Sequence, residues 1–219
     1  MTVGVPSGQH HRVVIGSQAL DLPIVPVAGE VAIALLMTID RGVAFTATAG
    51  VDLAAALAPL GPEVVATAAT LGIPVAIEVS RALGLDDYMV LQKTRKIHLG
   101  DALAEPLSSI TTTGSQSLFL DRARMAAVAG KRVVLVDDVI ATGGSIAACL
   151  RLLRAAGAEV VGIGCLLVEA GGWTEVLGDD AALVHALGEI PTFAPAADGT
   201  WTPARLTVSR RSIEPTRER

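Results

Sequence analysis

The amino-acid sequence predicts an α/β fold built on a doubly wound parallel sheet, and three observations support this prediction. Apolar runs typical of buried strands alternate along the chain with segments of helical spacing, and such alternation implies parallel strands joined by right-handed crossovers. Hydrophobic residues make up 51% of the chain and aromatic residues only 3%, which suits buried parallel strands better than an all-β sandwich. The 219 residues show no break in composition and fit a single domain, 1–219.

The first sixty residues are the least regular part of the pattern. We predict short strands or extended segments for RVVIG (12–16) and LPIVPVA (22–28). GEVAIALLMTID (29–40) is compatible with either a buried strand or a helix. VDLAAALAPLG (51–61) has helical spacing and ends at Gly61.

Two strand–turn–helix units follow, each with a glycine at the end of its helix. The first consists of the strand EVVATA (63–68) and the helix GIPVAIEVSRALG (72–84). The second consists of the strand RVVLVDD (132–138) and a helix that ends at Gly157. Further strands are expected for DYMVLQK (87–93) and EVVGIGCLLVE (159–169).

Residues 94–130 interrupt this alternation with a stretch too long for an ordinary connection in a compact domain. Within it, SSITTT (108–113) and SQSLFL (115–120) flank Gly114 and are expected to pair as a hairpin. Long loops of this kind often serve as active-site lids, so we expect a flexible lid at 94–117.

Charge and cysteine content narrow the functional classes. A net charge of −5 and a pI near 5.3 argue against a general nucleic-acid binder, which would carry a basic face. Cys149 and Cys165 lie in apolar surroundings and are expected to be buried, which suits a reducing cytoplasm. We find no export signal and expect no membrane span. His10 and His11 have no third metal ligand nearby and are expected in a solvated N-terminal arm.

The segment KRVVLVDDVIATGGS (131–145) carries the strongest chemical signal. In a parallel sheet, its apolar run would deliver Asp137 and Asp138 to the carboxyl edge, where ligands bind. The turn ATGGS (141–145) offers small side chains, hydroxyls and free N–H groups at a helix N-terminus, which favours a phosphate. Two carboxylates beside a phosphate would repel it unless they hold sugar hydroxyls or act through a divalent cation. A ribose phosphate bound with Mg²⁺ meets both requirements.

This segment resembles the phosphoribosyl pyrophosphate (PRPP) motif of type I phosphoribosyltransferases, most closely that of the adenine branch. It is neither a Walker loop nor a dinucleotide-binding fingerprint, because both glycine patterns are missing. The resemblance covers roughly residues 22–169 and implies a parallel sheet with a small hood and a lid. It divides the domain into an N-terminal arm with part of the hood (1–40), a core (41–169) and the C-terminal part of the hood with the tail (170–219).

The first strand–turn–helix unit is similar to the pyrophosphate loop of the same family, and its TLGIP sequence is most like that of xanthine phosphoribosyltransferases and purine repressor relatives. The resemblance implies a cis peptide in this loop and backbone N–H groups turned toward the pyrophosphate. Leu71 stands where adenine enzymes often have arginine, so the pyrophosphate contacts would come mostly from the backbone or from Lys93 and the lid loop.

The resemblance implies specific roles for these residues. Asp137, Asp138 and Lys93 would be catalytic, the two aspartates holding the ribose hydroxyls and Mg²⁺ directly or through water. The 5′-phosphate would be bound by Ala141, Thr142, Gly143, Gly144 and Ser145. The pyrophosphate would be bound by Ala69, Thr70, Leu71, Gly72, Lys93 and Lys96.

The implied reaction is transfer of the phosphoribosyl group from PRPP to a purine base, in a cytoplasmic homodimer. In hypoxanthine-guanine enzymes a third acid would stand at Ala141, so adenine ranks first, xanthine or another 6-oxopurine second and a specialised heterocycle third. A non-catalytic PRPP-sensing regulator is the alternative. Base-recognising residues are expected within 22–35 and 168–193, where Trp173 and Phe193 could either stack on the base or pack in the core.

Overall fold

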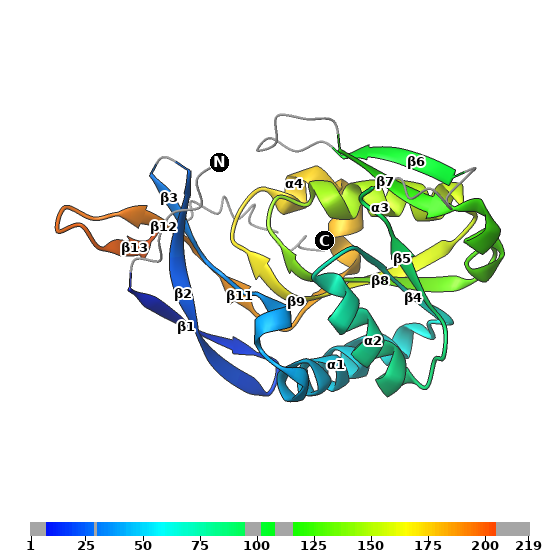
Figure 1. Ribbon diagram of the computed structural model, residues 1–219, viewed down its shortest axis with the longest axis horizontal. Helices are drawn as coiled ribbons and strands as arrows, with labels where there is room; N and C mark the ends of the chain where they lie inside the picture. The colour runs from blue at the N-terminus through cyan, green and yellow to red at the C-terminus, as the bar shows by residue number, and fades with distance from the viewer. Residues whose placement is uncertain (1–7, 29, 95–101, 108–115, 205–219) are drawn as a thin grey trace, which may run out of the picture.

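The computed structural model describes residues 8–28, 30–94, 102–107 and 116–204, and these form two parts, a core and a hood (Figure 1). The core is a six-stranded sheet in which all paired strands are parallel. Its spatial order is β10 (Val184–Ala186), β9 (Glu159–Glu169), β8 (Arg132–Ile140), β4 (Val64–Ala68) and β5 (Tyr88–Leu91), with β11 (Glu189–Ile190) also paired to β9. This confirms the predicted α/β fold class.

Helices cover both faces of the core sheet. Helices α1 (Val43–Leu57) and α2 (Gly72–Leu83) lie on one face, while α3 (Gly144–Ala155) and the short α4 (Trp173–Leu177) lie on the other (Figure 1). Each helical layer contributes to its own hydrophobic cluster against the sheet. Short 3-10 segments complete the helical structure: η1 (Thr38–Asp40), η2 (Ala58–Leu60), η3 (Arg122–Ala127) and η4 (Gly178–Leu183).

The hood is a five-stranded antiparallel sheet made from both ends of the described chain. Its spatial order is β1 (His10–Ile15), β2 (Gln18–Ala28), β3 (Val31–Ala34), β12 (Thr192–Pro195) and β13 (Trp201–Pro203). The expectation of a solvated arm at His10 and His11 is wrong, because both residues belong to β1 and pair with β2. The His11 ring also contacts the buried Phe193 ring edge-on, at 5.3 Å between centroids.

Helix α1 begins well before its predicted start. Residues 43–50 (VAFTATAG) mix alanine with Val, Phe, Thr and Gly, which are weaker helix formers. Phe45, Ala49, Leu53 and Leu57 recur at every fourth position and are all buried, so packing overrides the local preference. Residues Val43–Leu60 are long and apolar enough to cross a membrane by length and composition, and this helix packs here against α2 and β9 as a core helix does.

The structure describes the segment predicted as a lid only in part. Strands β6 (Ala102–Leu107) and β7 (Gln116–Asp121) form an antiparallel hairpin against α3, where Arg151 pairs with Glu105 at 2.5 Å. Residues 116–121 therefore pair with 102–107, whereas the predicted partner strand, 108–113, lies outside the described residues. Residues 95–101 and 108–115, which include most of the expected lid and Lys96, lie outside the described residues.

Candidate active site

The carboxyl ends of β4, β5 and β8 surround a cavity of about 400 Å³. Most of the predicted site residues line it: Ala69, Thr70, Leu71, Lys93, Asp137, Asp138, Ala141, Thr142, Gly143 and Ser145. Gly72 and Gly144 lie directly beside these residues as the first residues of α2 and α3. Three segments that are distant in the sequence therefore meet at one edge of the sheet, as expected for a parallel α/β fold.

The acid pair lies at the floor of this cavity. Asp137 and Asp138 lie near the end of β8, and Asp137 Oδ1 accepts a hydrogen bond from the Asp138 backbone N–H at 3.0 Å. Burial raises the pKa of Asp137 well above its usual value, and the neighbouring charge of Asp138 raises it further. Burial also raises the pKa of Asp138, while the nearby positive charge of Lys93 lowers the pKa of both acids. The pair is therefore a desolvated site that a cation or hydroxyl donors would stabilise.

The turn between β8 and α3 presents backbone donors to the same cavity. Gly143 has φ +80°, a left-handed conformation, and a Cβ there would lie 3.1 Å from the Trp173 carbonyl oxygen. No side chain caps the start of α3, so the first N–H groups of the helix remain available to an anion. Thr142 and Ser145 are exposed beside these groups. This geometry suits a phosphate.

The loop from β4 to α2 forms the opposite wall of the cavity. The peptide bond between Ala69 and Thr70 is cis, as the family resemblance implied. The loop is held by the Ala69 backbone N–H, which donates to the Leu91 carbonyl at 3.0 Å. It is also held by the buried Thr38 hydroxyl, which donates to the Leu71 carbonyl at 2.9 Å. Sequence reasoning missed Thr38, because its partner is remote in the chain.

The start of α2 approaches the acid pair closely. A Cβ added to Gly72 would lie 2.2 Å from Thr67 Oγ1 and 2.7 Å from Asp137 Oδ1. Only glycine therefore fits between the helix and the acid without a shift of one of them.

A second cavity, of about 250 Å³, adjoins the first on the hood side. Leu71, Asp138, Val139 and Ala141 line both cavities. Its other walls come from the end of β3, the apolar segment directly after β3, and one acid at the end of β9: Ile33, Ala34, Leu35, Leu36, Met37 and Glu169. A flat, mainly apolar ring would suit this cavity.

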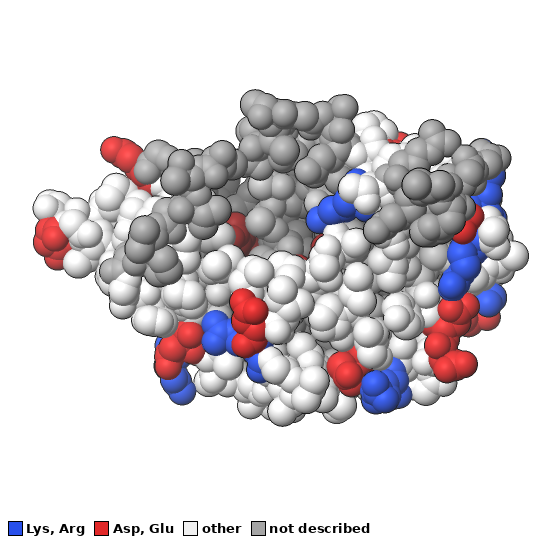
Figure 2. Space-filling model, viewed as in Figure 1, with Lys and Arg blue, Asp and Glu red and all other residues white. Residues whose placement is uncertain are grey.

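Glu169 lies within the segment 168–193 that was expected to recognise the base, although the sequence did not single it out; an argument from strand ends applied to β9 would have done so. Trp173 and Phe193, considered as stacking groups, line neither cavity. Phe193 of β12 is buried in the hydrophobic cluster that joins the hood to α1, and Trp173 packs beside α3. On the face shown in Figure 2, basic and acidic side chains of the described residues are interspersed and form no basic patch.

Comparison with known proteins identifies the family. Residues 48–187 match the Phosphoribosyl transferase domain. The chain belongs to the phosphoribosyltransferase family. This agrees with the family resemblance inferred from the PRPP motif and supports an enzyme of the transferase class.

Individual relatives differ in the base that they are named for. The adenine phosphoribosyltransferase of Clavibacter michiganensis subsp. michiganensis is 35% identical over 62% of this chain and 74% of its own length. The hypoxanthine/guanine phosphoribosyltransferase of Methanococcus voltae is 32% identical over 51% of this chain. The match spans only 56% of the length of that relative. The names of these relatives differ in the base, so the comparison leaves the base of this chain open.

A solved structure shows the same fold. The adenine phosphoribosyltransferase from Thermoanaerobacter pseudethanolicus superimposes with a TM-score of 0.52 and 25% identity, over 66% of this chain and 83% of that one. The parallel sheet and its helices are therefore those of the phosphoribosyltransferase fold.

Proposed function

We propose that this protein transfers the 5-phosphoribosyl group of PRPP to a ring nitrogen of adenine, giving the nucleoside monophosphate and pyrophosphate. In this reaction the bond from ribose C1′ to pyrophosphate breaks, a bond from C1′ to the base nitrogen forms, and the base loses a proton. The observation that carries the proposal is the meeting of the acid pair, the phosphate-binding turn and the pyrophosphate loop around one cavity.

Each wall of the cavity has a distinct role in this proposal. The turn 141–145 binds the 5′-phosphate through helix N–H groups, and the acid pair binds the ribose hydroxyls. The loop 69–72 binds the pyrophosphate through its backbone, while Lys93 stabilises the charge that develops on it. Catalysis then rests on positioning and electrostatics, with the segment 94–117 as a lid and Lys96 as a further pyrophosphate ligand.

The donor set fits Mg²⁺. The described residues contain no group of three or more His, Cys, Asp or Glu side chains that could hold a metal, so Asp137 and Asp138 would supply two carboxylates and substrate oxygens and water the rest. Mg²⁺ is commonly bound in this way, by one or two carboxylates together with substrate phosphates. When bound, the ion would neutralise negative charge on the pyrophosphate.

Two features favour adenine. By resemblance to hypoxanthine-guanine enzymes, an acid at position 141 would exchange a proton with the five-membered ring of a 6-oxopurine. Ala141 has no such group. The adjoining cavity is apolar apart from Asp138 and Glu169, which can only accept hydrogen bonds when ionised. Such a cavity suits the amino group of adenine better than a ring carbonyl.

The test is a turnover assay with Mg²⁺, PRPP and a panel of adenine, hypoxanthine, guanine, xanthine, orotate and uracil, followed by nucleotide and pyrophosphate formation. Adenine should be the best substrate. Turnover of hypoxanthine or guanine with none of adenine would contradict the proposed base. PRPP binding without turnover of any base would instead favour a PRPP-sensing regulator.

We further propose that the protein acts in the cytoplasm as a homodimer. Its two free cysteines are buried, which fits a reducing compartment. Ile39, Val43 and Val51 are exposed apolar residues on or beside α1, and burial against a second copy would stabilise them. Sedimentation velocity should give a dimer mass, and a monomer across the micromolar range would contradict this assembly.

A further inference from the structure

Glu169 occupies a distinctive place beside the candidate active site. It is the last residue of β9, whose neighbour β8 carries the acid pair. In the register of these strands Val168 lies opposite Ile140, so the next residues, Glu169 and Ala141, lie at the same level of the sheet edge. Both then line the hood-side cavity. The carboxyl group that Ala141 lacks is thus present one strand away.

The Glu169 side chain is half-buried, and no hydrogen-bond donor or basic group among the described residues partners it. Desolvation is the cause that raises its pKa. Most half-buried acids gain a partner on folding, because an unpaired one loses its hydration without compensation. The partner of this carboxyl is expected to enter the cavity from outside.

Building on the proposed function, we propose that Glu169 is a specificity-determining residue that accepts a hydrogen bond from the exocyclic amino group of the bound base. The cavity around this contact suits a flat ring, because its lining includes the apolar side chains of Ile33, Leu36, Leu71 and Val139. A purine held between them can turn its six-membered ring toward the end of β9.

The contact would discriminate between bases through the direction of the hydrogen bond. An amino group at C6, as in adenine, donates to the carboxylate. A carbonyl at C6, as in hypoxanthine, offers no hydrogen-bond donor at that position. Its oxygen would face the Glu169 carboxylate, so two acceptors would lie against each other. A site built around one hydrogen bond rejects a ligand that cannot make it, because its own polar group is then left unpaired.

Two variants test this role through kcat/KM for adenine and for hypoxanthine. Glu169→Leu removes the acceptor and should lower kcat/KM for adenine about 10- to 100-fold, as expected for loss of a hydrogen bond to a charged group. The loss should appear mainly in KM, because the contact is already made in the ground state. Glu169→Gln adds an N–H group that can donate a hydrogen bond to the C6 carbonyl of hypoxanthine, so the preference for adenine over hypoxanthine should fall about tenfold or more.

Matched controls separate recognition from structure. Glu189 pairs with the same strand from β11 and is exposed outside both cavities, so Glu189→Gln should retain the wild-type preference. PRPP affinity measured by calorimetry should be unchanged in both Glu169 variants.

Several results would overturn this role. An unchanged adenine preference in Glu169→Leu, or a fall in kcat with KM unchanged, would show that Glu169 does not recognise the base. So would a wild-type protein that prefers hypoxanthine. A wild-type protein that binds PRPP and turns over no base would overturn the proposed function itself, and the role of Glu169 with it.

Discussion

Among single residues, Asp137 and Asp138 illustrate how side chains placed for binding can lower the stability of the folded protein. Both carboxyls are desolvated in the folded chain, and each has a raised pKa for that reason first. The folded state therefore binds more protons than the unfolded state at pH values above the usual carboxyl pKa. By linkage, stability falls as the pH rises from that value through the raised folded pKa.

We therefore predict that Asp137→Asn stabilises the ligand-free protein at neutral pH. The amide is neutral and its oxygen can still accept the hydrogen bond from the Asp138 N–H. The gain in unfolding free energy, measured by urea denaturation without PRPP or Mg²⁺, should be larger at pH 8 than at pH 5, because acid already neutralises the wild-type side chain.

The control is the exposed Asp86, whose replacement by asparagine should change stability little at either pH. An Asp137→Asn variant that is less stable than the wild type at pH 8, or whose gain is equal at both pH values, would contradict the desolvation argument.

At the scale of elements, the connection from β4 to α2 brings the pyrophosphate loop against the acid pair. Gly72 allows the contact, since a Cβ would overlap Thr67 Oγ1 and Asp137 Oδ1. Thr38 of η1, the segment between the hood strand β3 and helix α1, fastens the same loop through the Leu71 carbonyl. One short connection thus links three parts of the site.

Gly72→Ala should therefore displace the start of α2 and weaken PRPP binding, with a loss of about 1–3 kcal/mol in stability, as is typical of overpacking. Gly172→Ala is the matched control, because Gly172 has φ −72° and a Cβ there would meet nothing within 4 Å. Calorimetry with PRPP and urea denaturation check both effects. Wild-type PRPP affinity in Gly72→Ala would show that the close approach has no functional role.

Thr38→Val should test the connection between η1 and the pyrophosphate loop. Losing the buried hydroxyl leaves the Leu71 carbonyl without this donor and should lower stability by about 1 kcal/mol. The affinity for PRPP should also fall, because the loop is held less firmly. Thr48→Val removes a comparable hydroxyl on the exposed face of α1 and should leave PRPP affinity unchanged. Equal PRPP affinities in the two variants would argue against a role for Thr38 in positioning the loop.

The sequence predicted the central elements well, because their signals are local. The strand at 159–169 was predicted with its observed ends, and Gly84 ends α2 in the left-handed conformation as expected. The early start of α1 and the partner of β7 were missed, because tertiary packing decides them. The site shows the same contrast. The acid pair and the phosphate turn are contiguous in the sequence, and Glu169 lies within the predicted segment 168–193, whereas Thr38 bonds to a partner that only the fold brings near.

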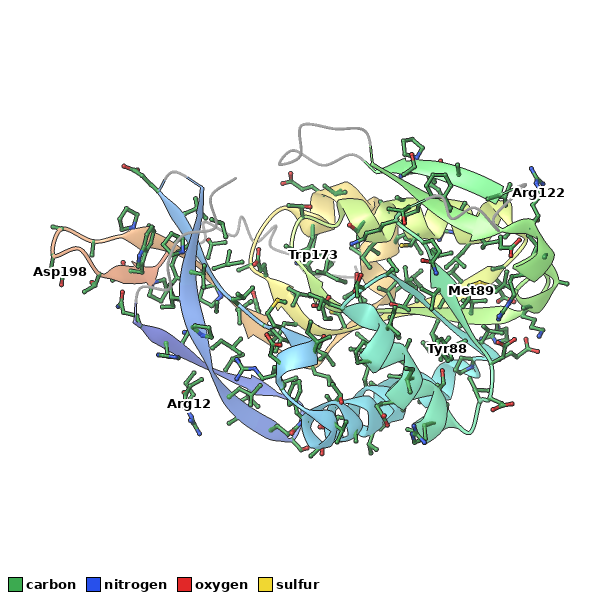
Figure 3. The ribbon with its side chains drawn as sticks, in the orientation of Figure 1. Arg12, Tyr88, Met89, Arg122, Trp173 and Asp198 are labelled. Carbon is green, nitrogen blue, oxygen red and sulfur yellow. The ribbon has the colours of Figure 1, made fainter. Side chains whose placement is uncertain are left out.

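At the scale of the whole molecule, we propose that the hood and core form one domain. A single hydrophobic cluster joins hood residues such as Leu22 and Phe193 to Leu53 of α1 and Val134 of the core sheet. Each part contains one tryptophan: Trp173 packs on the α3 side of the core, and Trp201 lies in β13 of the hood. Figure 3 shows Trp173 within the core and Asp198 at the outer tip of the hood hairpin.

Single-tryptophan variants can therefore report the two parts separately. Trp201→Phe leaves the core reporter and Trp173→Phe leaves the hood reporter. In urea unfolding, the midpoint that each variant shows by tryptophan fluorescence should coincide with the midpoint that the same variant shows by far-UV circular dichroism, as two-state unfolding requires. A hood signal that changes at lower urea than the circular dichroism of the same variant would show that the hood unfolds independently.

The central claim is that the acid pair and its neighbouring turn bind PRPP, and calorimetric titration of PRPP with Mg²⁺ tests it most directly. The wild type and the Asp86→Asn control should bind PRPP with equal affinity, while Asp137→Asn/Asp138→Asn should remain folded and lose about 100-fold or more, as expected when hydrogen bonds to two charged groups are removed. Unchanged PRPP affinity in the folded double variant, or no PRPP binding by the wild type, would contradict the claim.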